Sequence, residues 1–153
     1  MNKDLLIMSC LRRNSRESLT EMAKIVKMPI STIYDKLKLH EQNTIMKYTS
    51  ILDFAKLGFN TRAHVAIKIE RSQRAEATSF LMKHKHVNSI FKINNGFDFM
   101  LDVIFKHVKD LEDFLEQLES KYQVKSRQVF FVIDDLKREE FMSNPDELNL
   151  VDF

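Results

Sequence analysis

The chain has 153 residues, of which 44% are apolar and 30% charged, a size and balance typical of one domain or two small ones with a filled core. Its charge-free stretches are too short to cross a bilayer, and its amino terminus lacks the apolar core of a signal peptide. We therefore expect a cytoplasmic protein without membrane contact. Two glycines and one cysteine exclude glycine-rich phosphate loops, an internal disulfide and a zinc site built from cysteines.

Charge is unevenly distributed along the chain. Residues 1–50 carry nine Lys and Arg against five Asp and Glu, whereas residues 51–153 carry fifteen against seventeen. A basic excess confined to one segment is a weak indication of nucleic-acid contact in that segment.

The first 45 residues have the pattern of three short helices. Apolar residues recur at helical spacing over residues 3–12, and the helix predicted for residues 19–27 follows a capping box made of Ser18 and Glu21. Pro29 suits the opening of a third helix, because the N–H that proline lacks would have no intrahelical acceptor at that position. The connection of about three residues between the second and third helices predicts a helix-turn-helix.

The predicted third helix separates apolar from polar side chains. At 100° per residue, Ile30, Ile33 and Leu37 occupy one sector, which we expect to face the other two helices. The opposite sector has hydrogen-bonding groups suited to a DNA major groove, or, in the plainer interpretation, to solvent: Ser31, Thr32, Asp35 and Lys38, with Tyr34 and Lys36 on the flanks.

The rest of the chain predicts an α+β fold. Residues 45–52 have the pattern of a strand, followed by a bend at residues 56–58 that marks a linker. Strand and helix periodicities then alternate in the order β-α-β-β-α-β, with strands at 63–69, 87–93, 99–105 and 129–133 and helices around 77–84 and 111–122. This order is that of a ferredoxin-like domain, an antiparallel sheet with both helices on one face.

The sheet face without helices is also apolar in the predicted pattern. Such a face needs a cover, and a second copy of the same sheet is the simplest one, although long side chains or the carboxyl-terminal residues are alternatives. The residues assigned to this face are Ala66, Ile90, Met100, Ile104, Phe130 and Val132.

Several short motifs resemble the Lrp/AsnC, or feast/famine, family of transcription regulators. Asp4 opens the first helix where the family places an aspartate, and RESLTEMA at residues 16–23 resembles its R-x-S-x-x-E-L-A signature. STI at residues 31–33 fits the start of the family's recognition helix. LG at residues 57–58 fits its interdomain motif, and GFDF at 96–99 fits the loop between strands two and three.

The resemblance implies a sequence-specific regulator with an amino-terminal helix-turn-helix and a ferredoxin-like (ACT-like, or RAM) domain. Its partners would be double-stranded DNA, a second copy in a homodimer that assembles further to a tetramer or octamer, and an amino-acid or other small effector. The DNA-binding residues would be Arg16, Ser31, Thr32, Tyr34, Asp35, Lys36 and Lys38, and the effector-binding residues Gly96, Phe97 and Asp98. A plainer interpretation of the second group is a β-hairpin closed by Gly96 and capped by Asp98.

Enzymatic chemistry has little support in the sequence. We expect no catalytic residues, no cofactor and no metal, since His84 and His86 have metal-like spacing but no further ligand close in sequence. Arg62 and His64 share one strand face, which keeps open an alternative on the same architecture, a sirohaem-decarboxylase-like enzyme. A nonspecific DNA-organising protein and a ligand-binding module with a vestigial helix-turn-helix are further alternatives.

These patterns divide the chain into four parts. We expect a helix-turn-helix domain at residues 1–47, a linker strand and bend at 48–60, a ferredoxin-like oligomerisation and effector domain at 61–135, and a carboxyl-terminal tail at 136–153.

Overall fold

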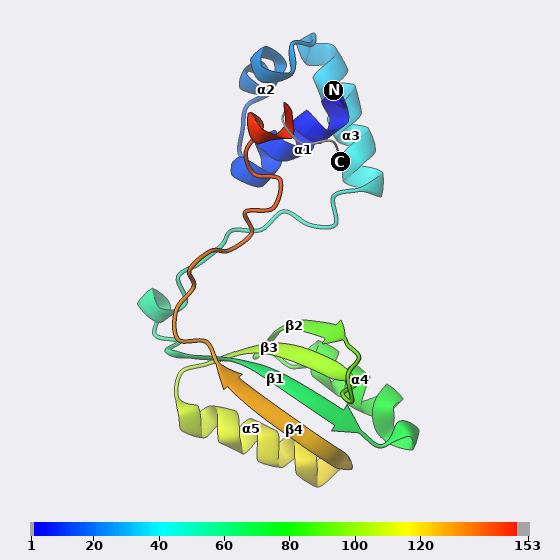
Figure 1. Cartoon of the computed structure of the whole chain (residues 1–153), viewed down its shortest axis with the longest axis vertical. Helices are drawn as coiled ribbons and strands as arrows, with labels where there is room; N and C mark the ends of the chain where they lie inside the picture. Colours follow the sequence, from blue (N-terminus) through cyan, green and yellow to red (C-terminus); the bar gives the residue numbers. More distant parts are fainter. Residues whose placement is uncertain (1, 150–153) are drawn as a thin grey trace. The chain divides into compact units, whose positions relative to one another are not determined.

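The computed structural model describes residues 2–149 and has two compact units. One consists of Met1–Ile51 and Leu136–Phe153, the other of Leu52–Asp135. The two ends of the chain therefore belong to the same unit, which Figure 1 shows as the red carboxyl-terminal segment beside the blue helix α1. Within residues 2–149, no helix is long and apolar enough to span a membrane.

Three helices form the first unit: α1 (Lys3–Arg13), α2 (Leu19–Val26) and α3 (Ile30–Asn43). Ser18 caps α2 as predicted, its hydroxyl accepting a hydrogen bond from the N–H of Glu21 at 3.1 Å. The Glu21 carboxylate pairs instead with Lys24 at 2.6 Å. The turn into α3 begins at Lys27, whose φ of 55° lies in the left-handed region.

The apolar sides of these helices enclose a small core. Its buried members include Leu6, Ile7 and Cys10 of α1, Met22 and Val26 of α2, and Ile33 of α3. The prediction that Ile30 is buried is wrong, because this side chain is 47% exposed. Ile30 is the first residue of α3, where the chain has only just entered the helix and no neighbouring turn covers it.

The strand predicted at residues 45–52 is absent from the described chain. The backbone there pairs with no other strand and has no regular secondary structure. The predicted bend is confirmed: a short 3-10 helix at Ala55–Leu57 ends at Gly58, whose φ of +86° favours glycine.

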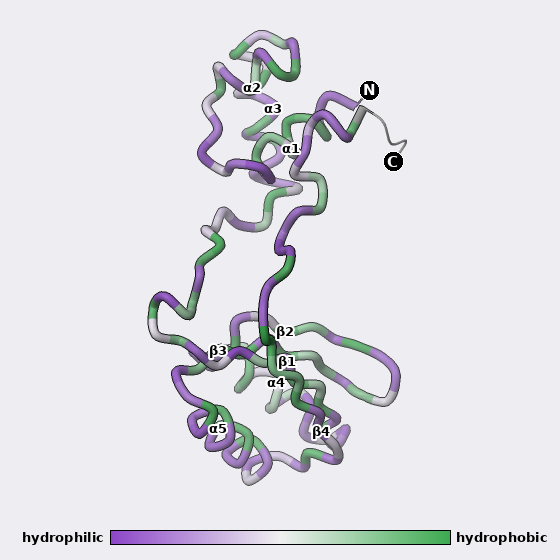
Figure 2. Tube along the Cα trace, turned by 60° about the vertical axis from the view of Figure 1, so that its left-hand side comes forward, coloured by the Kyte–Doolittle hydropathy of each residue, from purple (hydrophilic) through white to green (hydrophobic). Residues whose placement is uncertain are grey.

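The second unit is the predicted ferredoxin-like domain. Its strands β1 (Thr61–Ile69), β2 (Val87–Lys92), β3 (Phe99–Phe105) and β4 (Val124–Phe131) form an antiparallel sheet in the order β2-β3-β1-β4. Helices α4 (Arg74–Lys83) and α5 (Val108–Lys121) cover one face (Figure 1). Along α5, hydrophobic and hydrophilic stretches alternate with the turns of the helix (Figure 2), as its four buried apolar residues require.

Two details of the sheet differ from the prediction. A bulge between Val87 and Ser89 shifts the register of β2, so that Ile90 lies opposite Leu101 and packs on the helix-covered side, while Phe91 takes the open face opposite Met100. The fourth strand begins at Val124 and ends at Phe131, which leaves Ile133 outside the sheet and 92% exposed.

Candidate DNA-binding and effector sites

Helix α3 presents one polar row to solvent. Ser31, Tyr34, Asp35 and Lys38 are exposed, three or four residues apart, and Ile33 on the opposite side is fully buried. The structure brings these four predicted DNA-binding residues together on one helix face. Thr32 lies on the flank of this face and is half-buried.

Two members of this row contact each other. The Lys38 ammonium lies 4.6 Å from the centre of the Tyr34 ring. Its hydrogen bond to Tyr34 raises the pKa of Lys38, and nearby Asp35 and Glu41 act in the same direction. Lys38 therefore remains cationic at any physiological pH, with its ammonium over an aromatic ring.

Lys36, another predicted DNA-binding residue, faces α1. Its ammonium lies 2.8 Å from Asp4 Oδ1, and His40 Nε2 lies 3.3 Å from the same oxygen. The hydrogen bond from Lys36 holds the pKa of Asp4 below its ordinary value, against the opposing effect of burial, and His40 lowers it further. We call Asp4, Lys36 and His40 the α1–α3 clamp, because these three side chains fix α3 to the start of α1.

Arg16 lies exposed in the turn between α1 and α2, where its backbone N–H donates to Asn14 Oδ1 at 3.0 Å. The contact of His40 with Asp4 was not predicted from the sequence, although Lys36 and His40 are spaced i, i+4 and so lie on one helix face.

The predicted effector residues form a tight hairpin. Asn95 and Gly96 have φ of 62° and 86°, and the space where a Gly96 side chain would stand is open. Phe97 is half-buried.

Both carboxylate oxygens of Asp98 have partners inside the domain. Oδ2 accepts from the N–H of Ile69 at 2.9 Å, and Oδ1 pairs with Arg74 at 3.1 Å. Asp98 thus joins the hairpin to the end of β1 and the start of α4.

A charged centre lies on the open sheet face. The Arg62 guanidinium donates to both oxygens of Asp102 at 2.9 and 3.1 Å and also binds Asp135 at 3.0 Å. Asn88 donates to Asp102 at 2.7 Å, and His64 lies 3.5 Å from it. The hydrogen bond to Asp102 raises the pKa of Arg62, so Arg62 remains cationic throughout the physiological range.

His84 and His86 lie in an aromatic cluster. His86 stacks on Phe105 at 4.4 Å, and His84 lies 4.6 Å from Phe114. Burial lowers the pKa of His84, so its neutral form is favoured. His86 Nδ1 is 2.7 Å from the carbonyl of Ile104 and must be its donor. Across residues 2–149, no group of three or more acidic, histidine or cysteine side chains is placed to hold a metal ion.

Comparisons with known proteins agree on one family. A sequence model of the Lrp/AsnC ligand binding domain matches residues 62–141. The chain is 26% identical to an HTH-type transcriptional regulator of Pyrococcus furiosus named FL11, over 85% of this chain and 87% of that protein.

Solved structures have the same fold. A transcriptional regulator from Neisseria meningitidis in complex with L-methionine matches with a TM-score of 0.82 and 22% identity, over 90% of this chain and 92% of that one. LrpC of Bacillus subtilis matches with a TM-score of 0.80 and 20% identity, over 90% and 96% of the two chains. The chain belongs to the Lrp/AsnC family, as its match to the family's ligand binding domain over more than half of its length shows.

Proposed function

We propose that the protein is a DNA-binding transcriptional regulator whose recognition element is α3. The observation that carries this proposal is the exposed row of Ser31, Tyr34, Asp35 and Lys38 on a helix whose other side completes the helix-turn-helix core. Relatives that cover most of the chain are named as HTH-type transcriptional regulators. A regulator of this kind acts where the chromosome lies, which agrees with the expected cytoplasmic location.

In this proposal the side chains of α3 divide into two roles. Ser31, Thr32, Tyr34 and Asp35 are near base edges in the major groove, and Lys38 and Arg16 contact phosphates. Lys36, which the sequence also assigned to phosphates, is bound to Asp4, so we assign it first to orienting α3.

The open sheet face supports a dimer. Phe91, opposite Met100, and Phe130, opposite His64, are more than half exposed on it, and a second copy would remove their surface from water. Arg62 and Asp102 already neutralise each other within one chain, which reduces the cost of burying them in an interface. Two recognition helices related by a two-fold axis imply pseudo-palindromic DNA sites. Larger assemblies, tetramers or octamers, would be built from this dimer.

An amino-acid effector is proposed for the domain that matches the family's ligand binding domain. The similar regulator from Neisseria meningitidis is in complex with L-methionine. Because the Asp98 carboxylate is occupied by Ile69 and Arg74, we assign Asp98 to shaping the loop, and the open backbone at Gly96 and Phe97 to contacting the ligand.

The enzymatic alternative has weaker support. Arg62, one of the two residues on which it rests, has its guanidinium bound to the carboxylates of Asp102 and Asp135. A substrate would have to break these ion pairs to reach it. His64, the other residue, is near Asp102.

The experiment that tests the proposal is DNase footprinting on genomic fragments, followed by a salt titration on any protected site. Protection of a pseudo-palindromic sequence with tighter binding than to random duplex supports a sequence-specific regulator. Equal affinity for all duplexes would instead indicate a DNA-organising protein. Absence of duplex binding at low ionic strength would contradict both.

A further inference from the structure

Residues 136–149, which follow the sheet and are called the segment below, belong to the helix-turn-helix unit. Leu148 is only 9% exposed and belongs to the same apolar cluster as Leu6, Ile7 and Cys10. Met142 packs against this cluster, and Pro145 is buried. The segment therefore contributes side chains to a core that α1, α2 and α3 alone leave incomplete.

One arginine of α1 fixes the position of the segment. Arg12 binds Glu139 Oε2 at 3.0 Å through Nη1, the Glu139 carbonyl at 2.8 Å through Nη2 and the Phe141 carbonyl at 3.0 Å through Nε. Two of the three acceptors are backbone groups, so the guanidinium fits a particular chain conformation as well as a charge.

The segment adopts unfavourable backbone angles in this position. Glu139 and Met142 have φ of 55° and 60°, in the left-handed region that is unfavourable for a residue with a side chain. Such angles persist only where surrounding contacts outweigh the cost. The contacts that outweigh it here are the Arg12 hydrogen bonds and the packing of Met142 and Leu148 in the apolar core.

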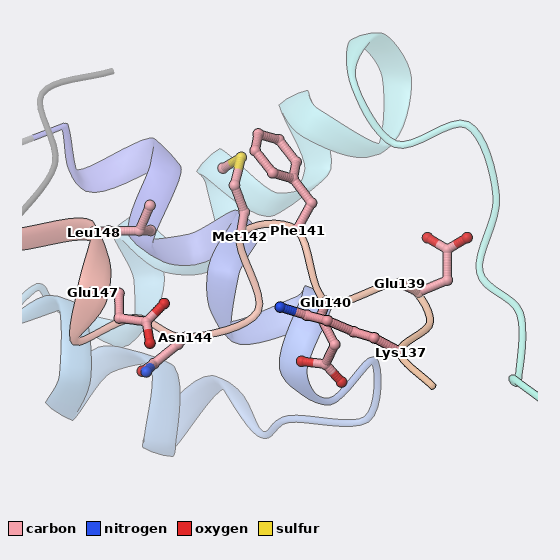
Figure 3. Close-up of a pocket in the computed structure, with 8 residues that line it drawn as sticks. All are labelled: Lys137, Glu139, Glu140, Phe141, Met142, Asn144, Glu147 and Leu148. Atoms are coloured by element: carbon pink, nitrogen blue, oxygen red, sulfur yellow. The ribbon is translucent and has the colours of Figure 1, made fainter. Parts of the chain in front are cut away.

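Charge complements these contacts. Residues 136–149 carry four acidic and two basic side chains, whereas residues 1–51 carry nine basic and five acidic ones. Figure 3 shows Glu139, Glu140 and Glu147 around the same pocket, of about 520 Å³, as the apolar Phe141, Met142 and Leu148. Every residue lining this pocket comes from the segment.

We propose that the surface of α1 around Arg12 is a docking surface for residues 139–148 of the same chain, and that this docking completes and stabilises the helix-turn-helix. The segment and α1 belong to one compact unit of the same chain, which favours docking within one chain over exchange with a second copy. The consequence for DNA affinity, but not the docking itself, rests on the proposed function.

The test is hydrogen exchange of α1 in the full-length protein and in Leu148→Asp. A carboxylate at the buried position of Leu148 could not be solvated, so the segment would leave the core. We therefore expect amides of Lys3–Arg13 to exchange at least tenfold faster in this variant. Leu136→Asp is the matched control, because Leu136 is 94% exposed, and it should leave the exchange rates unchanged. Equal protection of α1 in all three proteins would overturn the proposal.

A second pair of variants tests the arginine. Arg12→Ala should make residues 139–148 exchange faster and become sensitive to protease, whereas Arg13→Ala removes only a pair with Glu17 four residues on. If both variants behave like the unmodified protein, Arg12 does not hold the segment. Protection of α1 that is lost on dilution would show docking onto a second copy and overturn the intramolecular form.

Failure of the proposed function gives a different result from failure of the docking. If Leu148→Asp loses α1 protection but neither this variant nor the unmodified protein binds DNA, the docking proposal stands and the regulator proposal falls. If both proposals stand, Leu148→Asp binds the DNA site at least fivefold more weakly than Leu136→Asp does, because fewer molecules have an intact recognition unit.

Discussion

Single residues on α3 determine how the proposed DNA contact divides between affinity and specificity. Lys38 is exposed and kept cationic beside Tyr34, whereas Ser31 presents a short hydroxyl near the start of the helix. A cation that faces phosphate acts on every sequence alike, and a hydroxyl at a base edge discriminates between sequences.

Lys38→Ala should weaken binding to specific and random duplexes by a similar factor and reduce the slope of log K against log salt by about one. Fluorescence anisotropy over a range of salt concentrations measures both quantities. Lys109→Ala, on an exposed lysine of α5 that pairs with Asp113, is the control. A change in sequence preference without a change in slope would place Lys38 at a base instead.

Ser31→Ala should alter sequence preference by about 1–3 kcal/mol at one base-pair position while leaving the salt slope unchanged. Selection of binding sites from a random library by the two proteins would reveal the altered position. Identical selected sites would remove Ser31 from the base-contacting set.

The turn residue Lys27 offers a test of stability alone. Its left-handed φ of 55° costs a side-chain-bearing residue about 1 kcal/mol that glycine avoids. Lys27→Gly should therefore raise the free energy of unfolding by about that amount in urea titration. Lys24→Gly, inside α2, should lower it by about 1 kcal/mol, and a loss of stability in both variants would contradict the assigned backbone strain.

At the scale of elements, the α1–α3 clamp gives the helix-turn-helix a pH dependence of known sign. Because hydrogen bonding lowers the pKa of Asp4 in the folded protein below its ordinary 3.8, the clamp stabilises fully above about pH 4. That stabilisation is lost as the pH falls through the folded-state pKa.

Asp4→Asn should lower stability at pH 7 by about 0.5 kcal/mol, a modest value because Asp4 is partly solvated. The difference from the unmodified protein should shrink as the pH falls from 3.8 through the folded-state pKa of Asp4, because the carboxyl is then protonated in both states. Urea unfolding at pH 7 and at successively lower pH values measures this, with Asp113→Asn as a control in an exposed ion pair. A difference that persists at low pH would show that the carboxylate charge is not responsible.

Elements are also the scale at which the sequence was most informative. Helical periodicity, the Ser18 cap and Pro29 placed α1, α2 and the start of α3 within a residue or two, and alternation placed β1 and β3. The register of β2 was not predictable, because the bulge before Ser89 leaves no mark in the apolar pattern. The first half of β4 was missed because polar residues there hide the alternation of apolar and polar side chains. Ser126 and Gln128 face the open side, and Arg127, on the helix-covered side, pairs with Glu119 of α5.

The candidate sites were predictable to the extent that they lie within one element. The exposed row of α3 follows from helical spacing, but the pairing of Lys36 with Asp4 joins residues 32 positions apart. The charged centre around Asp102 joins residues 40 positions apart. Position on a helix face can be deduced from local sequence, whereas partners contributed by distant elements cannot.

For the whole molecule, we expect the open sheet face to determine the proposed assembly. Phe130→Asp places a charge where the proposed dimer buries a ring that is 52% exposed in one chain, so we expect light scattering coupled to gel filtration to find monomers. Met82→Asp, on an exposed side chain of α4, should leave the mass unchanged. An unmodified protein that elutes as a monomer at micromolar concentration would contradict the dimer.

The composition of the helix-turn-helix unit from both ends of the chain also determines when the unit can be finished during synthesis. Residues 52–148 take about 5 to 20 s to translate at about 5–20 residues per second. During much of that interval α1 to α3 are already synthesised but lack Leu148 and Met142 to close their core. A nascent chain stalled before residue 139 would therefore expose its incomplete apolar core to chaperones and proteases. Only chains translated past Leu148 would have a helix-turn-helix with a complete core.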